Sequence, residues 1–202
     1  MKRAARWEWA LLIALLVSFA WGTWADRTQQ QLSDKVLRLH VLANSDSEAD
    51  QALKRKVRDS VLETASAILA DCPDRETAEQ RLSAALPEIE DAARARIAAE
   101  GGKQTVTAEL RSTVFPTREY EDFTLPAGEY LALRVVLGEG EGHNWWCVVF
   151  PPLCAETTSS LSQTAMAAGL TEEEVALITE SDGYQLKFKA VELWEKLMAY
   201  FR

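Results

Sequence analysis

Two histidines and three cysteines are the residues with the widest choice of chemistry in this sequence of 202 residues. His143, Cys147 and Cys154 lie within one short segment, HNWWCVVFPPLC, and His40 lies far upstream of it. A disulfide between Cys147 and Cys154 would close a short loop and stabilise it by roughly 2–3 kcal/mol. Metal binding by the same two cysteines and the two histidines is a second possibility, although their spacing matches no standard zinc pattern.

Nucleophilic catalysis by a cysteine is a third possibility. It requires Cys147 or Cys154 to be activated by His40 or His143, and the sequence shows no strained elbow or other signature around either thiol. We therefore predict no catalytic residue, no bound metal and no cofactor, with a disulfide as the candidate state of the two neighbouring cysteines. Cys72, in a different part of the chain, is expected to be a plain, half-buried thiol.

The segment 144–150 is predicted to be a β-strand that is apolar on both faces. Three glycines, at 138, 140 and 142, favour a chain reversal, so we expect a hairpin between this strand and the apolar segment 130–137. Alternation along the strand places Trp145, Cys147 and Val149 on one face and Trp146, Val148 and Phe150 on the other. One face must cover the core, and the other must be covered by a helix, by a loop or by another molecule.

The first 25 residues are typical of an export signal. Lys2, Arg3 and Arg6 precede an apolar run, and Thr23-Trp24-Ala25 is a tolerable cleavage site of the small-x-small type. Tryptophans at both ends of the run are equally typical of a membrane-spanning helix, so residues 1–25 are predicted to be either a signal peptide or a membrane anchor. By the positive-inside rule, the rest of the chain is exported in both cases.

Residues 26–34 are predicted to be a linker, and residues 35–202 a single domain with a core of its own. The apolar patterns predict strands at 36–42, 105–110, 130–137 and 144–150 and helices at about 46–70, 75–100, 171–180 and 187–201. We expect Ser45 and Glu48 to form a capping box for the first of these helices, and Pro87 to kink or restart the second. The expected fold is α+β, with a small, mainly antiparallel sheet packed by helices on one side and preceded by a transmembrane or signal helix.

The charge of the chain argues against one class of partner. The net charge is −9, and residues 1–25 contribute +2, so the predicted domain and linker carry −11. An acidic body repels phosphate backbones, which makes nucleic acid an unlikely ligand class. The basic residues Lys54, Arg55, Lys56 and Arg58 are predicted to form a solvated helix face, with contact to anionic lipid or to an acidic partner as the alternative.

Two segments together resemble the stage II sporulation protein R family. They are HNWWCVVFPPLC and the earlier RLHVLANSDSEADQALKRKVRDSVLE, and the order of parts over most of residues 35–197 is also similar to that family. The resemblance implies a signalling protein of endospore formation that is made in the forespore and exported into the intermembrane space. There it would activate a membrane-embedded protease of aspartic type in the mother cell, which then processes pro-sigma-E. The competing class is a zinc- or thiol-dependent hydrolase of the cell envelope.

The resemblance therefore favours a protein partner over a small-molecule substrate. We expect the segments 38–46 and 143–154 to form one surface that contacts the protease, with Trp145 or Trp146 as the anchor because large aromatic side chains dominate interface energetics. The residues predicted to contact the partner are Arg38, His40, Asn44, Asp46, His143, Asn144, Trp145 and Trp146. For Arg38, His40 and Arg134, an internal network of ion pairs with Asp46, Asp59 or Glu109 is the alternative.

Overall fold

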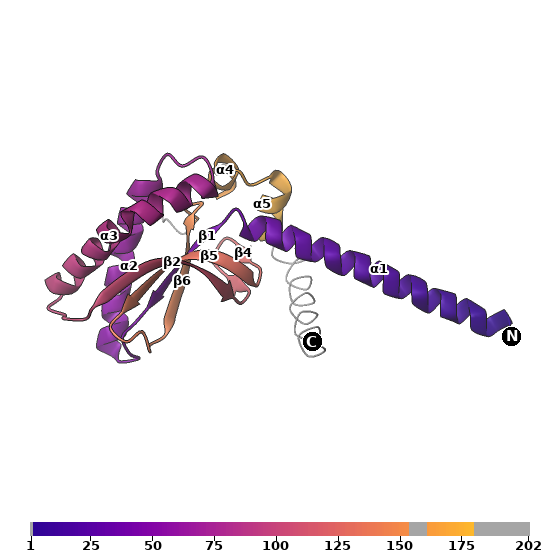
Figure 1. The fold of residues 1–202 in the computed structure, drawn as a ribbon, viewed down its shortest axis with the longest axis horizontal. Helices are drawn as coiled ribbons and strands as arrows, with labels where there is room; N and C mark the ends of the chain where they lie inside the picture. The colour runs from indigo at the N-terminus through magenta and orange to yellow at the C-terminus, as the bar shows by residue number, and fades with distance from the viewer. Residues whose placement is uncertain (1, 154–160, 180–202) are drawn as a thin grey trace.

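A computed structural model describes residues 2–153 and 161–179 of the chain. A four-stranded sheet lies at the centre of the fold, and a long N-terminal helix projects from it (Figure 1). The elements in chain order are α1 (Lys2–Ser33), β1 (Leu37–Leu42), α2 (Glu48–Leu69), α3 (Arg75–Ala99), β2 (Val106–Phe115), β3 (Arg118–Glu119), β4 (Thr124–Leu125), β5 (Gly128–Leu137), β6 (Asn144–Phe150), α4 (Leu161–Ala167) and α5 (Glu172–Thr179). The prediction of an α+β fold is confirmed.

The central sheet has the strand order β2-β5-β1-β6. The pairs β2–β5 and β1–β6 are antiparallel, and β1–β5 is parallel, so the sheet is mixed and mainly antiparallel as predicted. The predicted hairpin between β5 and β6 is wrong, because β1 lies between these two strands and pairs with both. All six residues of β1 are buried, because β1 lies inside a sheet that is covered on both faces.

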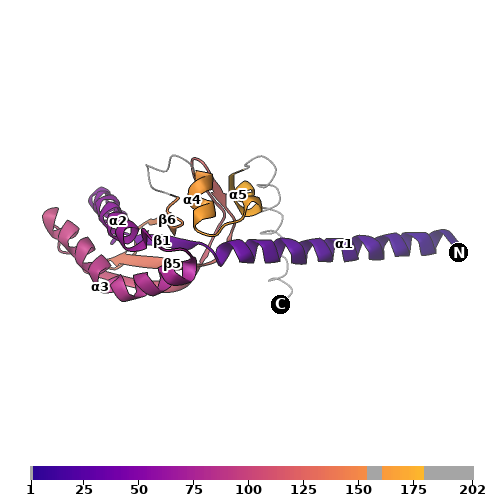
Figure 2. The ribbon, with the colours of Figure 1, turned by 90° about the horizontal axis from the view of Figure 1, so that it is seen from above.

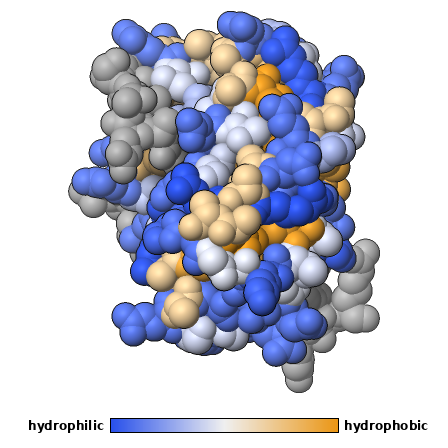
Figure 3. All heavy atoms as spheres, turned by 90° about the vertical axis from the view of Figure 1, so that its left-hand side faces the viewer, coloured by the Kyte–Doolittle hydropathy of each residue, from blue (hydrophilic) through white to orange (hydrophobic). Residues whose placement is uncertain are grey.

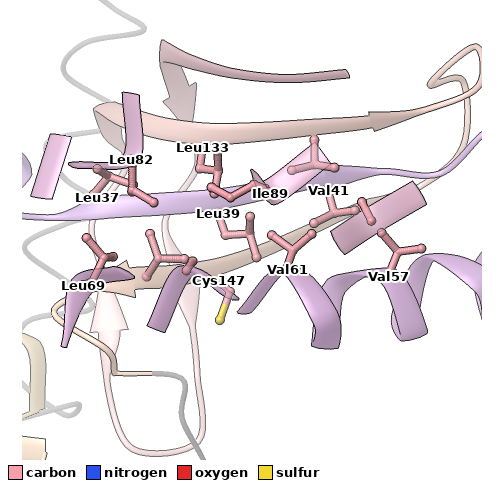
Figure 4. Packing of buried hydrophobic residues seen from close by; sticks show 14 of the residues in the cluster. Leu37, Leu39, Val41, Val57, Val61, Leu69, Leu82, Ile89, Leu133 and Cys147 are labelled. Atoms are coloured by element: carbon pink, nitrogen blue, oxygen red, sulfur yellow. The ribbon is translucent and has the colours of Figure 1, made fainter. Parts of the chain in front are cut away.

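Aliphatic side chains fill the face of the sheet that α2 and α3 cover. Leu37, Leu39 and Val41 project from β1 into this layer and are fully buried. Figure 4 shows them between side chains of α2 and α3 and those of neighbouring strands. The layer also contains Val57, Val61, Ala65 and Leu69 from α2, Leu82, Ile89, Ala93 and Ile97 from α3, and Leu133, Val135, Leu137, Cys147 and Val149 from the sheet. The alternation in the strands and the helical spacing in α2 and α3 thus meet in one core.

The beginning of α2 differs from the prediction by two residues. Ser47, not Ser45, caps the helix, and its hydroxyl accepts a hydrogen bond from the backbone N–H of Asp50 at 3.2 Å. The hydroxyl of Ser45 lies before the helix, where it donates to the Asp50 carboxylate at 2.6 Å and accepts from the backbone N–H of Ser47 at 3.2 Å. A serine hydroxyl therefore still accepts a hydrogen bond from a backbone N–H of the first turn of α2, but the serine is Ser47 and not Ser45.

The second helix of this layer, α3, runs through Pro87 without a restart. Of the two alternatives predicted for Pro87, a kink or a restart of the helix, the restart is therefore wrong. Proline removes one backbone hydrogen bond inside a helix, but Pro87 and Ser83, whose carbonyl loses its donor, are both exposed. Water can satisfy that carbonyl, which makes the proline tolerable at this place.

The opposite face of the sheet is covered by a second layer, so the prediction of helices on one side only is wrong. This layer combines the end of α1, the β3–β4 excursion, α4 and α5, and it buries aromatic as well as aliphatic side chains. Its members include Leu32, Phe115, Phe123, Leu125, Tyr130, Val148, Leu153, Ala165, Val175 and Ile178. Phe150 was expected here but packs in the first layer, because the register of β1 and β6 shifts between Leu37 and Arg38.

The N-terminal helix α1 runs without a break from residue 2 of the predicted signal segment to residue 33 of the predicted linker. Its last turns touch the domain, where Leu32 is fully buried, and the rest extends away along the longest axis of the molecule (Figure 2). Leu11, Leu15 and Phe19 on the projecting part are exposed. Within the described residues, no helix combines the length and the apolarity needed to cross a membrane.

The last described helix, α5, begins where the sequence predicts it. The hydroxyl of Thr171 accepts from the backbone N–H of Glu174 at 3.2 Å, and the Glu174 carboxylate accepts from the backbone N–H of Thr171 at 2.7 Å. This is a complete capping box. The predicted amphipathic helix at 187–201 lies outside the described residues.

Candidate functional site

The two segments that were predicted to form one surface meet at the end of the sheet where β1 stops and β6 starts. The last residues of β1 lie beside the first residues of β6, and Leu42 is paired with Asn144 and Val41 with Trp145. We refer to the exposed group formed by Asp46, His143, Asn144 and Trp145, with half-buried Asn44 at its base, as the corner. The end of the domain turned away from α1 is mostly hydrophilic, with smaller apolar areas between polar side chains (Figure 3).

Close backbone packing holds the corner together at the loop between β5 and β6. The side chain of Asn44 accepts from the backbone N–H of Glu139 at 3.1 Å, and the backbone N–H of Gly142 donates to the carbonyl of Ala43 at 2.9 Å. A Cβ on Gly142 would lie 2.3 Å from the carbonyl oxygen of Ser45. Glycine is therefore required at 142 by this close approach and not by an unusual φ.

Asp46 and His143 form the polar part of the corner. The carboxylate of Asp46 accepts from the backbone N–H of His143 at 2.6 Å and also contacts the ring Nδ1 of the same residue. The hydrogen bond from the His143 side chain, together with that from its backbone, lowers the pKa of Asp46. Because the His143 side chain is 79% exposed, the pair presents an oriented imidazole ring to solvent.

Lys54 supports His143 from below. It is only 4% exposed, and its ammonium group donates to the backbone carbonyl of His143 at 2.7 Å and to the side-chain oxygen of Gln51 at 2.7 Å. Burial lowers the pKa of Lys54. The prediction of a solvated Lys54 is therefore wrong, since this lysine fixes the loop that carries His143.

Trp145 supplies the apolar part of the corner. Its side chain is 38% exposed, and the guanidinium of Arg58 lies over its ring at 4.2 Å from the ring centroid. This cation–π contact orients the indole while leaving part of it open to solvent. Of the two tryptophans proposed as the anchor, Trp145 is thus the one that points outward, and Trp146 is half-buried against the aromatic second layer.

Two predicted contact residues lie in the interior. Arg38 is 0% exposed and His40 is 8% exposed, because their side chains enter the aromatic second layer. Burial is the main reason why the pKa of His40 is lowered, and the Asn144 side chain shifts that pKa in the opposite direction. The predicted ion-pair partners are also wrong for Arg38: Glu109 pairs with Arg134 at 2.9 Å, and no carboxylate among residues 2–153 and 161–179 pairs with Arg38. Neither side chain is therefore exposed at the surface that the sequence predicted for them.

The cysteines bear on the alternative of a thiol enzyme. Cys147 is disulfide-bonded, so it has no thiolate with which to attack a substrate. Cys154 lies outside the described residues, and its predicted pairing with Cys147 stays a prediction. Cys72 is a free, half-buried thiol as expected, and burial raises its pKa.

The hydroxyl of Ser45, which lies near the Asp46–His143 pair, donates to the Asp50 carboxylate at 2.6 Å and not to the imidazole ring. No group of three or more potential metal ligands occurs in the part of the chain that the structure describes. The arrangement is suited to binding, through an imidazole, a side-chain amide and an indole that are all held in place.

Sequence reasoning missed the two basic residues that support the corner. Lys54 lies three residues before Val57 and seven before Val61, so it belongs to the apolar stripe of α2, and Arg58 follows it by one helical turn. Leu53 was assigned to the stripe in place of Lys54 and is only partly buried. The spacing was thus a usable signal, and only the charge of the lysine concealed it.

Comparison with known proteins identifies the family of the chain. Residues 33–160 match the family model described as stage II sporulation protein R. A relative of that name from Bacillus subtilis (strain 168) is 40% identical over 147 residues, which are 71% of this chain and 66% of the relative. No solved structure matches. The matched residues include β1, the corner and both supporting basic residues. The chain belongs to the stage II sporulation protein R family.

Proposed function

We propose that this chain is a signalling ligand of endospore formation that is exported from the forespore and activates a membrane-embedded protease, which then processes pro-sigma-E. Membership of the stage II sporulation protein R family supports a sporulation role. Export is supported by the basic start of the chain and by exposed apolar side chains along α1, such as Leu11 and Phe19. The hydrolytic chemistry belongs to the partner.

The corner is the proposed contact surface for that protease. The observation that carries this proposal is the Trp145 ring, which Arg58 orients and which stays 38% exposed beside the Asp46–His143 pair. An aromatic side chain held in one orientation loses little conformational entropy on binding, and such residues supply most of the energy of protein interfaces. The oriented polar groups around the Trp145 ring would fix the position of the partner on the corner.

The test is a Trp145→Ala variant, produced with the protease and pro-sigma-E in a bacterium that does not sporulate. We expect cleavage of pro-sigma-E to fall strongly, because loss of a central aromatic contact typically weakens binding by roughly 30-fold or more. The amount of exported protein and its urea unfolding curve are measured in parallel. A variant that is exported, folds normally and still triggers normal cleavage would remove the corner from the proposal.

Val114→Ala is the matched control. Val114 is 75% exposed and lies near the end of the edge strand β2, which is the far edge of the sheet from β6. The change removes exposed apolar surface of a similar kind without touching the corner. Cleavage at the level of the unmodified chain is the expected result for this control.

A further inference from the structure

The outer side of β2 is a strand edge that pairs with no other strand of the described residues. β2 comes first in the order β2-β5-β1-β6, so only its inner side is paired, with β5. Just before β2, the carbonyl of Thr105 accepts from the backbone N–H of Gly138 at 2.9 Å. The two sides of a strand alternate, so odd-numbered residues bond to β5 and even-numbered residues turn their N–H and C=O groups outward. Such a free edge is a template for pairing with another strand.

The usable part of this edge is short and has clear limits. At one end, the carboxylate of Glu90 accepts from the outward N–H of Ala108 at 2.8 Å. At the other end, Pro116 has no N–H to donate. The outward backbone groups between these limits make no hydrogen bond to any other described residue, and they belong to Leu110, Ser112 and Val114.

We propose that this edge binds a second copy of the chain, through an antiparallel pair of β2 strands related by a twofold axis at Ser112. In this register Ser112 lies opposite Ser112 of the second copy, and Leu110 lies opposite Val114 of the second copy. Each of these opposite pairs exchanges two hydrogen bonds, so every free donor and acceptor of the edge is used. Pairing ends where Ala108, whose N–H is occupied, lies opposite Pro116 of the second copy, which has none.

The neighbouring registers are less favourable. A shift of one strand by two residues places Arg111 opposite Arg111 of the second copy, and like charges directly opposite each other destabilise a sheet. A shift in the other direction places Leu110 opposite Pro116 of the second copy, which removes a donor. In the proposed register, Arg111 lies opposite Thr113 of the second copy. The contact between Leu110 and Val114 also buries apolar surface, because Val114 is 75% exposed in the single chain.

The helix α3 leaves room for the second copy. It covers the half of the β2 edge that precedes Ser112, where Glu90 reaches Ala108. The first turns of α3, at Arg75 and Glu79, line a groove of about 550 Å³ that reaches Ser112. A twofold axis at Ser112 therefore places the two α3 helices over opposite halves of the paired strands, on the same face of one continuous sheet.

This inference is independent of the proposed function. The corner lies at β6, which is the opposite edge of the sheet from β2. Both corners therefore stay exposed in the pair, and the Val114→Ala control of the corner keeps its expected result. Failure of the pairing would leave the proposal for the corner intact, and the reverse also holds.

The first experiment is disulfide cross-linking of a Ser112→Cys variant of the full chain in detergent. The Cα atoms of a hydrogen-bonded antiparallel pair are about 5.5 Å apart, which is within reach of a disulfide. We expect a covalent dimer as the main product of oxidation on a non-reducing gel. Thr107→Cys is the matched control, because Thr107 is also exposed on β2 but would lie roughly 33 Å from Thr107 of the second copy. The unmodified chain gives the background from the free thiol of Cys72.

The second experiment measures the dissociation constant of the pair by sedimentation. Ser112→Lys should raise it by roughly fivefold or more, because two positive charges would lie directly opposite each other. Thr107→Lys adds the same charge away from the axis and should leave it unchanged. Urea unfolding shows whether both variants keep the fold, and where Ser112→Lys does not, the cross-linking comparison decides alone.

Two results would overturn the proposal. One is cross-linking of Ser112→Cys that is no greater than that of Thr107→Cys. The other is association of the chain that Ser112→Lys does not weaken, since the copies would then meet at a different surface, such as the exposed apolar side chains of α1.

Discussion

The two faces of the central sheet are packed by different means. The face under α2 and α3 is aliphatic, and its central residues Leu37, Leu39 and Val41 are fully buried. The other face receives Arg38 and His40 from the same strand and surrounds them with aromatic rings. A strand of six residues thus contributes to an apolar core and to a polar interior at once, which shows that alternation sets where side chains point and not what surrounds them.

The difference predicts how each face responds to substitution. In the aliphatic layer, stability depends on filled volume, so each lost methylene leaves a cavity. In the aromatic layer, stability depends also on ring geometry and on the charge of Arg38, so substitutions of equal volume differ in their effects. Two pairs of variants can separate these effects.

The largest expected effect is at the centre of the aliphatic layer. Leu39→Ala should lower the free energy of unfolding by about 2–5 kcal/mol, because Leu39 is 0% exposed and neighbours on both sides of the layer surround it. Urea unfolding followed by far-UV circular dichroism measures the change. Leu110→Ala, at a half-buried position on edge strand β2, should have a clearly smaller effect. Equal losses at the two positions would contradict a dependence on buried volume.

A somewhat smaller effect is expected at the aromatic layer. Phe115→Leu keeps an apolar side chain but removes the cation–π contact with Arg38 and ring contacts with His40, Tyr130 and Trp146. We expect a loss of about 2–3 kcal/mol in the free energy of unfolding. The matched control is Phe123→Leu, because Phe123 is also buried but, among the described residues, its ring pairs with Tyr120 alone. If both variants lose the same amount, the charge of Arg38 contributes nothing to this layer.

The sequence predicted the aliphatic layer far better than the aromatic one. Periodicity identified the strands and the buried positions of α2 and α3, because burial of aliphatic side chains repeats with the period of the backbone. It could not place β1 between β5 and β6, since strand order depends on long-range pairing that local patterns do not encode. It also could not tell that Arg38 is buried, because a charged side chain at an alternating strand position has the same pattern whether it points to water or into an aromatic layer. For Lys54 the helical spacing was a usable signal, which the charge concealed.

The candidate site was predicted in part. The sequence predicted that the segments of Asp46 and His143 lie together and left open which tryptophan points outward. In the structure Asp46 and His143 are in contact, and Trp145 is the exposed tryptophan. The supporting contacts of Lys54 and Arg58 could not be predicted, because they join a helix to a strand that lies about 90 residues later in the chain. Such contacts follow from tertiary packing alone.

The smallest expected effect lies at the corner, which belongs neither to the aliphatic layer nor to the aromatic layer. Asp50 accepts hydrogen bonds from the side chains of Ser45 at 2.6 Å, Asn44 at 2.9 Å and Gln104 at 3.0 Å. These hydrogen bonds lower the pKa of Asp50, and the bond from Ser45 has the largest effect. A carboxylate whose pKa is lowered by folding stabilises the fold above its ordinary pKa of about 4, and this contribution is lost as the pH falls through the lowered value.

Asp50→Asn should therefore lower the Tm at pH 7 by about 2–4 °C, a modest change because Asp50 is partly exposed. The difference from the unmodified chain should begin to shrink below about pH 4, where Asp50 of the unfolded chain takes up a proton, and should be lost below the lowered pKa of the native carboxylate. Thermal unfolding between pH 3 and 7 measures it. Leu39→Ala is the comparison, because Leu39 carries no titratable group and its deficit should persist across this range. A constant difference for Asp50→Asn would show that shape at this position, and not charge, holds the loop of the corner.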